Sequence, residues 1–66
     1  MKFRINGKEE ELFTETSLDS LVENKGLKRE IIVIEHNLQI IAKENWSNIL
    51  LAEGDNIEIV KFMGGG

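Results

Sequence analysis

The last three residues of the sequence are glycines, and a role in folding does not explain them. They are Gly64, Gly65 and Gly66. Glycine loses more conformational freedom on ordering than any other residue, so three in succession do not stabilise a fold. A segment without side chains is slim enough to pass through a narrow channel of another protein, carrying the α-carboxylate of Gly66 at its tip. A frayed end or a cloning remnant would look the same in sequence.

Other residues offer little chemistry. The sequence has no cysteine and a single histidine, His36, which excludes a disulfide and a Cys/His zinc site. No nucleophile motif accompanies His36, so we interpret it as an ordinary turn residue. The acidic run at residues 9–11 indicates a solvated edge strand rather than a metal site, because neighbouring strand residues point to opposite faces. We therefore expect no catalytic residue, no metal site and no bound cofactor.

Length and charge narrow the class of protein. The 66 residues suffice for one small domain of modest stability, which must be stabilised by the packing of apolar side chains. A net charge of -4 disfavours nucleic acid, which needs a basic surface, and favours a protein partner with a basic docking groove. No signal peptide is recognisable, and no apolar run approaches the ~20 residues that span a bilayer. We expect a soluble cytoplasmic protein without membrane contact.

The first strands are predicted from alternation. Met1, Phe3 and Ile5 alternate with basic residues, which places three apolar side chains on one face of a half-buried strand. Asn6-Gly7 is the typical sequence of a two-residue hairpin turn with positive φ angles. The returning strand is expected over residues 8–13.

A short helix is predicted next. Thr16 and Asp19 have the spacing of a helix N-cap, and Gly26 is placed to end the helix in a left-handed conformation. An apolar stripe follows the cap at helical spacing and must lie against the sheet, because so short a helix is marginal alone. The residues of this stripe are Leu18, Leu21 and Val22.

The β-branched run at residues 31–34 predicts a strand with apolar side chains on both faces. One face takes the helix, and no second helix is available for the other. Residues 35–37 are expected to turn, residues 38–41 to return as a short strand, and Trp46 to close one end of the core within residues 42–49. An apolar patch is therefore expected on the open face.

The last strand is expected to follow a turn at residues 53–56 and to begin at Ile57. Ile57 and Ile59 alternate toward the helix, while Val60 and Phe62 point to the opposite face. With one alternate pair from residues 31–34, Val60 and Phe62 should form the exposed apolar patch. Together with Met63, they are our candidate partner interface.

The order strand, strand, helix, strand, strand, strand with terminal glycines is that of the ubiquitin-like β-grasp fold, an α+β fold with a mixed sheet of about five strands and one main helix on one face. In detail the sequence resembles the ThiS family of sulfur carriers in thiamine biosynthesis. His36 and Ala42 depart from the commonest pattern, in which arginine and proline are frequent. The resemblance implies a β-grasp domain at residues 1–62 and a flexible glycine tail at residues 63–66. The similar stretches are residues 34–37, 40–41, 43–46, 54–60 and 62–66.

The resemblance also implies a function. The Gly66 carboxylate would be adenylated by an E1-like adenylating enzyme and converted to a thiocarboxylate. A sulfur-donor protein such as a cysteine desulfurase would supply the sulfur, which a thiazole synthase would use to build the thiazole ring of thiamine. Gly64 and Gly65 would thread the channels of these partners. ATP would be used by the activating enzyme, and the chain itself would be neither a cofactor-binding protein nor an enzyme.

Two alternatives from the same fold remain open. A ubiquitin-like interaction module or protein tag also combines a β-grasp domain with a glycine tail, but it would form an isopeptide bond with a target lysine. A sulfur carrier of another pathway, such as molybdopterin synthesis, is the second. An enzyme ranks last, because the terminal glycines precede no helix and no Lys-Ser/Thr and so do not make a phosphate-binding loop.

Overall fold

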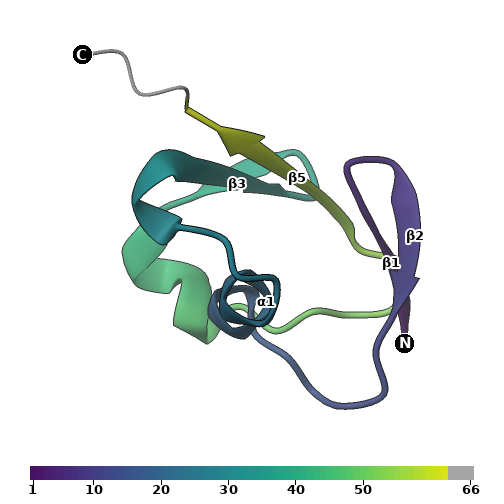
Figure 1. Cartoon of the computed structure of the whole chain (residues 1–66). Coiled ribbons are helices and arrows are strands. Elements are labelled where there is room, and N and C mark those ends of the chain that lie inside the picture. The colour runs from purple at the N-terminus through teal and green to yellow at the C-terminus, as the bar shows by residue number, and fades with distance from the viewer. Residues whose placement is uncertain (63–66) are drawn as a thin grey trace.

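A five-stranded sheet with one helix packed on one of its faces forms the fold (Figure 1). The computed structural model describes residues 1–62, and the predicted glycine tail lies outside them. The strand order is β2-β1-β5-β3-β4, in which β1 and β5 are parallel and the other neighbours are antiparallel. The predicted α+β class and mixed sheet are confirmed. The elements are β1 Lys2–Ile5, β2 Lys8–Glu11, α1 Leu18–Asn24, β3 Ile32–His36, β4 Gln39–Ile41 and β5 Asn56–Lys61, with 3₁₀ turns at Arg29–Ile31 and Lys43–Asn48.

The first hairpin follows the prediction at its turn and differs at its end. Asn6 and Gly7 both have positive φ, 51° and 82°, as a type I′ turn requires. Strand β2 ends at Glu11 and not at residue 13. The reason is pairing: the ladder ends at Lys2 opposite Glu11, and beyond it the Leu12 amide donates to the Met1 carbonyl at 3.0 Å, which leaves Phe13 without a partner on β1.

The helix begins one residue later than predicted. The hydroxyl of Ser17 accepts a hydrogen bond from the Ser20 amide at 3.0 Å, so Ser17 and not Thr16 is the N-cap. Thr16 instead donates its hydroxyl to the carbonyl of Thr14. At the other end Gly26 has a φ of 68°, and its amide donates to Glu23, which confirms the predicted left-handed termination.

The core lies between α1 and the sheet. The predicted helix stripe is buried there, and Trp46 is fully buried with its indole Nε1 donating to the Ile41 carbonyl at 3.0 Å. The prediction that Trp46 is a packing residue is confirmed. The buried apolar residues are Phe3, Ile5, Leu18, Leu21, Val22, Ile32, Ile34, Trp46, Leu51 and Ile57.

No helix in residues 1–62 is long and apolar enough to cross a membrane.

The second hairpin turns later than predicted. Glu35 and His36 belong to β3, and the turn is made by Asn37 and Leu38, whose φ angles are 50° and 72°. Asparagine tolerates this left-handed region better than most residues, and the turn places His36 opposite Gln39. Strand β4 accordingly starts at Gln39 instead of residue 38. Strand β5 starts at Asn56, one residue before the predicted position.

Leu21 provides a test of this packing. Replacing Leu21 by alanine should lower the free energy of unfolding by roughly 2 to 5 kcal/mol, because it removes a buried side chain from the contact between α1 and the sheet. The control is Phe13→Ala at a side chain that is 87% exposed, which should cost no more than about 0.5 kcal/mol. Urea unfolding measures both, and equal losses would contradict the assigned packing.

Candidate partner interface

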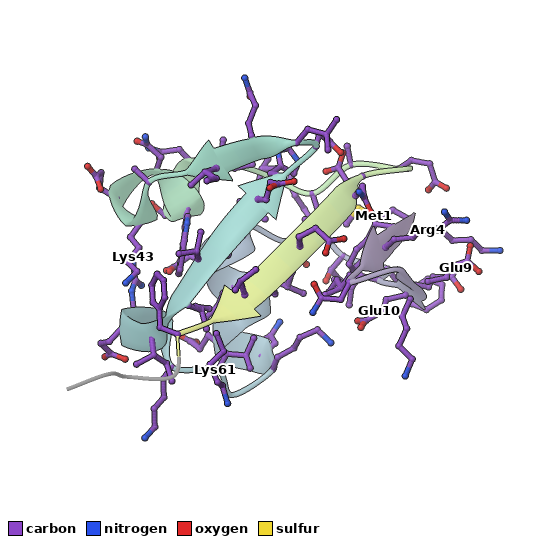
Figure 2. All side chains as sticks on the ribbon, turned by 90° about the horizontal axis from the view of Figure 1, so that it is seen from above. Met1, Arg4, Glu9, Glu10, Lys43 and Lys61 are labelled. Atoms are coloured by element: carbon purple, nitrogen blue, oxygen red, sulfur yellow. The ribbon has the colours of Figure 1, made fainter. Side chains whose placement is uncertain are left out.

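The face of the sheet opposite α1 is the open face, and Figure 2 shows the strands in front of the helix. Ile32 and Ile34 are fully buried, so the residues that alternate with them, Val33 and Glu35, point to the open face. Residues directly opposite one another on neighbouring strands share a face. The register therefore adds Val60, opposite Val33, to the residues of this face.

Four apolar residues of the open face form what we call the apolar patch: Val33, Ile40, Val60 and Phe62. Val60 and Phe62 are 57% and 52% exposed, which confirms their predicted exposure, while their role in a partner interface stays a prediction. Ile40 on β4 lies opposite Glu35 and is 72% exposed. Sequence reasoning missed Ile40, although its alternation with the half-buried Ile41 was a usable signal. Exposed apolar surface of this kind is typical of protein interaction sites.

The patch adjoins the end of β5. The backbone amide of Phe62 donates to the Ile31 carbonyl at 2.6 Å, which extends the contact between β5 and the β3 side beyond Lys61. The other predicted site residues, Met63, Gly64, Gly65 and Gly66, lie outside the described part of the chain. The structure thus places the apolar patch directly before the four residues whose roles stay predictions.

Asn6 fixes the position of β5 from the other side. Its side-chain oxygen accepts a hydrogen bond from the Ile59 amide at 2.8 Å, and its side-chain nitrogen donates to the Ile59 carbonyl at 3.3 Å. These two bonds take the place of backbone bonds from a neighbouring strand. They continue the β1–β5 ladder beyond the end of β1. The turn preference of Asn6 was predicted from the sequence, but this second role was not.

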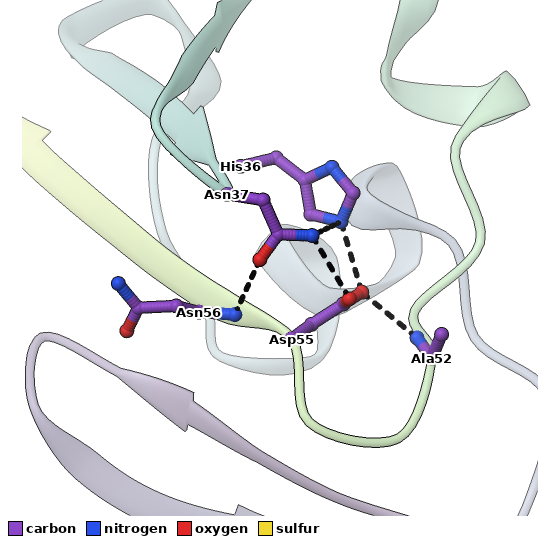
Figure 3. Close-up of polar contacts among 5 residues, drawn as sticks. All are labelled: His36, Asn37, Ala52, Asp55 and Asn56. Carbon is purple, nitrogen blue, oxygen red and sulfur yellow. Dashed lines mark hydrogen bonds and ion pairs between the residues drawn. The ribbon is translucent and has the colours of Figure 1, made fainter.

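A polar network holds the start of β5 (Figure 3). His36 Nε2 lies 2.8 Å from Asp55 Oδ2, which also accepts from the Ala52 amide at 2.8 Å. The side chain of Asn37 donates to Asp55 Oδ1 at 3.1 Å and accepts from the Asn56 amide at 2.8 Å. The interpretation of His36 as an ordinary turn residue is therefore wrong: it ends β3 and contacts the residue before β5.

Asp55 is the centre of this network, and its contacts favour the ionised carboxylate. Burial of its carboxyl raises the pKa, but the hydrogen bonds from His36, Asn37 and the Ala52 amide lower it by more, so the net pKa lies below the ordinary value. These partners saturate the carboxylate, which gives it a structural role. Within residues 1–62 no group of three or more His, Cys, Asp or Glu side chains is placed so that it could hold a metal ion.

This chain is similar to a known protein family, to a named relative and to a solved structure. A family model described as the ThiS family matches residues 3–66. The Sulfur carrier protein ThiS of Bacillus subtilis is 36% identical over 64 residues, covering 96% of this chain and 97% of that protein. The crystal structure of the thiamine biosynthesis protein ThiS from Geobacter metallireducens superimposes with a TM-score of 0.86 at 25% identity, with 100% of both chains covered.

A longer relative was also found. A protein named thiazole synthase in Paramagnetospirillum magneticum is 33% identical over 66 residues, which is 100% of this chain but 20% of that protein. The chain thus spans about a fifth of the length of this relative. A segment similar to this whole chain therefore occurs within a larger polypeptide.

The pKa of Asp55 predicts an acid dependence of stability. Because the folded pKa lies below the ordinary 3.8, ionised Asp55 stabilises the fold above that value and loses its contribution as the pH falls through the folded pKa. Asp55→Asn should lower the free energy of unfolding by about 1 to 3 kcal/mol at pH 7, with a smaller deficit below about pH 4. Urea unfolding across this pH range measures the deficit.

The control for this measurement is Glu15→Gln, which removes one carboxylate from an exposed position. This variant should follow the wild type at every pH, because Glu15 has no hydrogen bond from its side chain in residues 1–62. A deficit of Asp55→Asn that stayed constant between pH 7 and pH 3, or a variant more stable than wild type, would contradict the assigned role of Asp55.

Proposed function

The chain belongs to the ThiS family, and we propose that it is a sulfur carrier of thiamine biosynthesis whose Gly66 carboxylate is adenylated and then converted to a thiocarboxylate. The observation that carries the proposal is the extent of the match: the family model covers residues 3–66 and so includes the terminal glycines. Near-complete coverage of the Bacillus subtilis sulfur carrier supports the same reading. The chain is a carrier and not an enzyme, as these relationships indicate.

The chemistry requires activation by another protein. A carboxylate is a poor acyl donor, because its carbonyl carbon is electron-rich and oxide is a poor leaving group. In the proposed first step an oxygen of the Gly66 carboxylate attacks the α-phosphorus of ATP, and pyrophosphate leaves. A sulfur nucleophile then attacks the carbonyl carbon, the new C–S bond forms, and AMP leaves with the broken C–O bond. We propose that an E1-like adenylating enzyme provides the site, and that a donor such as a cysteine desulfurase supplies the sulfur as a persulfide. The attack of the persulfide gives an acyl disulfide. A thiol then attacks the donor's sulfur of this S–S bond, which releases the thiocarboxylate and leaves a disulfide.

The proposed acceptor of the sulfur is a thiazole synthase. The relative from Paramagnetospirillum magneticum supports this pairing, since its name is thiazole synthase and one fifth of it is similar to this chain. The apolar patch is the surface we propose for docking, because it is exposed and lies directly before the tail. Docking there would bring Gly64 and Gly65 to the partner's channel, while α1 and the core stay intact.

The central test concerns the Gly66 carboxylate. Wild type, a chain lacking Gly66 and a chain with one alanine added after Gly66 are incubated with the activating enzyme, ATP and a sulfur donor, and are then weighed. Wild type should gain about 16 Da by exchange of oxygen for sulfur at the activated acyl carbon. The altered chains should react at least about 100-fold more slowly, because one residue displaces that carbon by up to about 3.6 Å.

Equal thiocarboxylate formation in all three chains would refute this mechanism. A stable adduct with a lysine of another protein, in place of the 16 Da gain, would favour the ubiquitin-like tag instead. The control chain carries Phe13→Ala alone. Phe13 is an exposed residue outside the strands and outside the apolar patch, so this change should leave the mass gain unaffected.

A further inference from the structure

Two carboxylates lie side by side in the middle of the open face. Glu35 on β3 is directly opposite Glu58 on β5, the two strands flanked by β4 and β1. Both side chains are half-buried. The next pair on this face is Val33 with Val60, and Ile40 lies opposite Glu35 on the other side. The acidic pair is therefore bordered by the apolar patch on two sides.

This pair is not compensated within the described part of the chain. Like charges directly opposite one another on neighbouring strands are destabilising. The ion pairs formed among residues 1–62 are Lys25 with Glu10, Arg29 with Asp19, and His36 with Asp55, and none includes Glu35 or Glu58. Arg4, a cation of the same face, is opposite Glu9 on β2 and Asn56 on β5, and it is in none of these ion pairs; Figure 2 shows Arg4 and Glu9 at the β1–β2 side.

We propose that Glu35 and Glu58 determine partner specificity by jointly receiving an arginine side chain of the thiazole synthase when the apolar patch docks. This inference rests on the proposed function. The planar guanidinium group offers several N–H donors in a fixed fork, which suits two adjacent carboxylates better than a lysine ammonium does. Docking of the patch would exclude water around the pair, and the charge of the arginine would relieve its repulsion.

The uncompensated charge of the pair and its position favour this role over simple solubility. Carboxylates that only keep an apolar face soluble would serve equally well at its rim, where they lose no hydration. Glu35 and Glu58 instead occupy central strands next to the apolar patch, where a docked partner would desolvate them. A desolvated carboxylate pair without a cation would oppose binding, so a partner that lacks the arginine would be rejected.

The test compares Glu35→Gln/Glu58→Gln with a matched control, Glu9→Gln/Glu11→Gln. The control removes the same charge from the same face, at the edge strand β2. Binding to the thiazole synthase of the same organism is measured by calorimetry at low and at moderate salt. The Glu35/Glu58 variant should bind about tenfold more weakly and lose most of its salt dependence, with an unfolding midpoint equal to or above that of wild type. The control should change the Kd by less than about twofold.

A Phe62→Glu chain separates this inference from the proposed function. If Phe62→Glu weakens binding while the Glu35/Glu58 variant binds like wild type, the apolar patch docks and the arginine site is refuted. Equal loss in the Glu35/Glu58 variant and in the Glu9/Glu11 control would also refute it, because the effect would then come from net charge. Failure of the wild type itself to bind would overturn both the proposed partner and this inference.

Discussion

Residues 1–62 contain one short α-helix, and this helix can cover only one face of the sheet. Other features of the molecule follow from this constraint. Helix α1 has seven residues and covers one face of a five-stranded sheet. On that face Ile32, Ile34 and Ile57 are fully buried. So small a chain buries only about 60% of the surface that it exposes when unfolded, and no further helix among the described residues covers the other face. The exposure of Val60 and Phe62 follows directly from this shortage.

The position of β5 then becomes the main structural requirement, because β5 leads into the residues proposed to react. Three separate contacts fix it: the network of Asp55 at its start, the side chain of Asn6 beside Ile59, and the bond from Phe62 to Ile31 at its end. Each contact comes from a segment distant in sequence. The strand is thereby held on both sides up to Phe62, and its open side carries the surface proposed for docking.

Local pattern predicted the parts of the fold that depend on neighbouring residues. Alternation placed Val60 and Phe62 on the open face, and helical spacing placed Leu21 in the core, because each side chain's direction follows from the backbone period. Contacts between distant residues were beyond such reasoning. The pairing of His36 with Asp55 joins residues 19 apart, and it depends on a turn that forms at Asn37 and Leu38 instead of residues 35–37. The choice of Ser17 over Thr16 as N-cap likewise depended on where the preceding loop ends, since both residues have capping side chains.

The most direct test of the account asks which face of the sheet meets the partner. The chain, with ¹³C-labelled isoleucine and valine methyl groups, is titrated with the thiazole synthase and followed by NMR. If the open face meets the partner, the methyl signals of Val33, Ile40 and Val60 shift or broaden, while those of the buried Val22 and Ile32 keep their positions. Changes confined to Val22 and Ile32, with the open-face methyl groups unaffected, would contradict docking on this face.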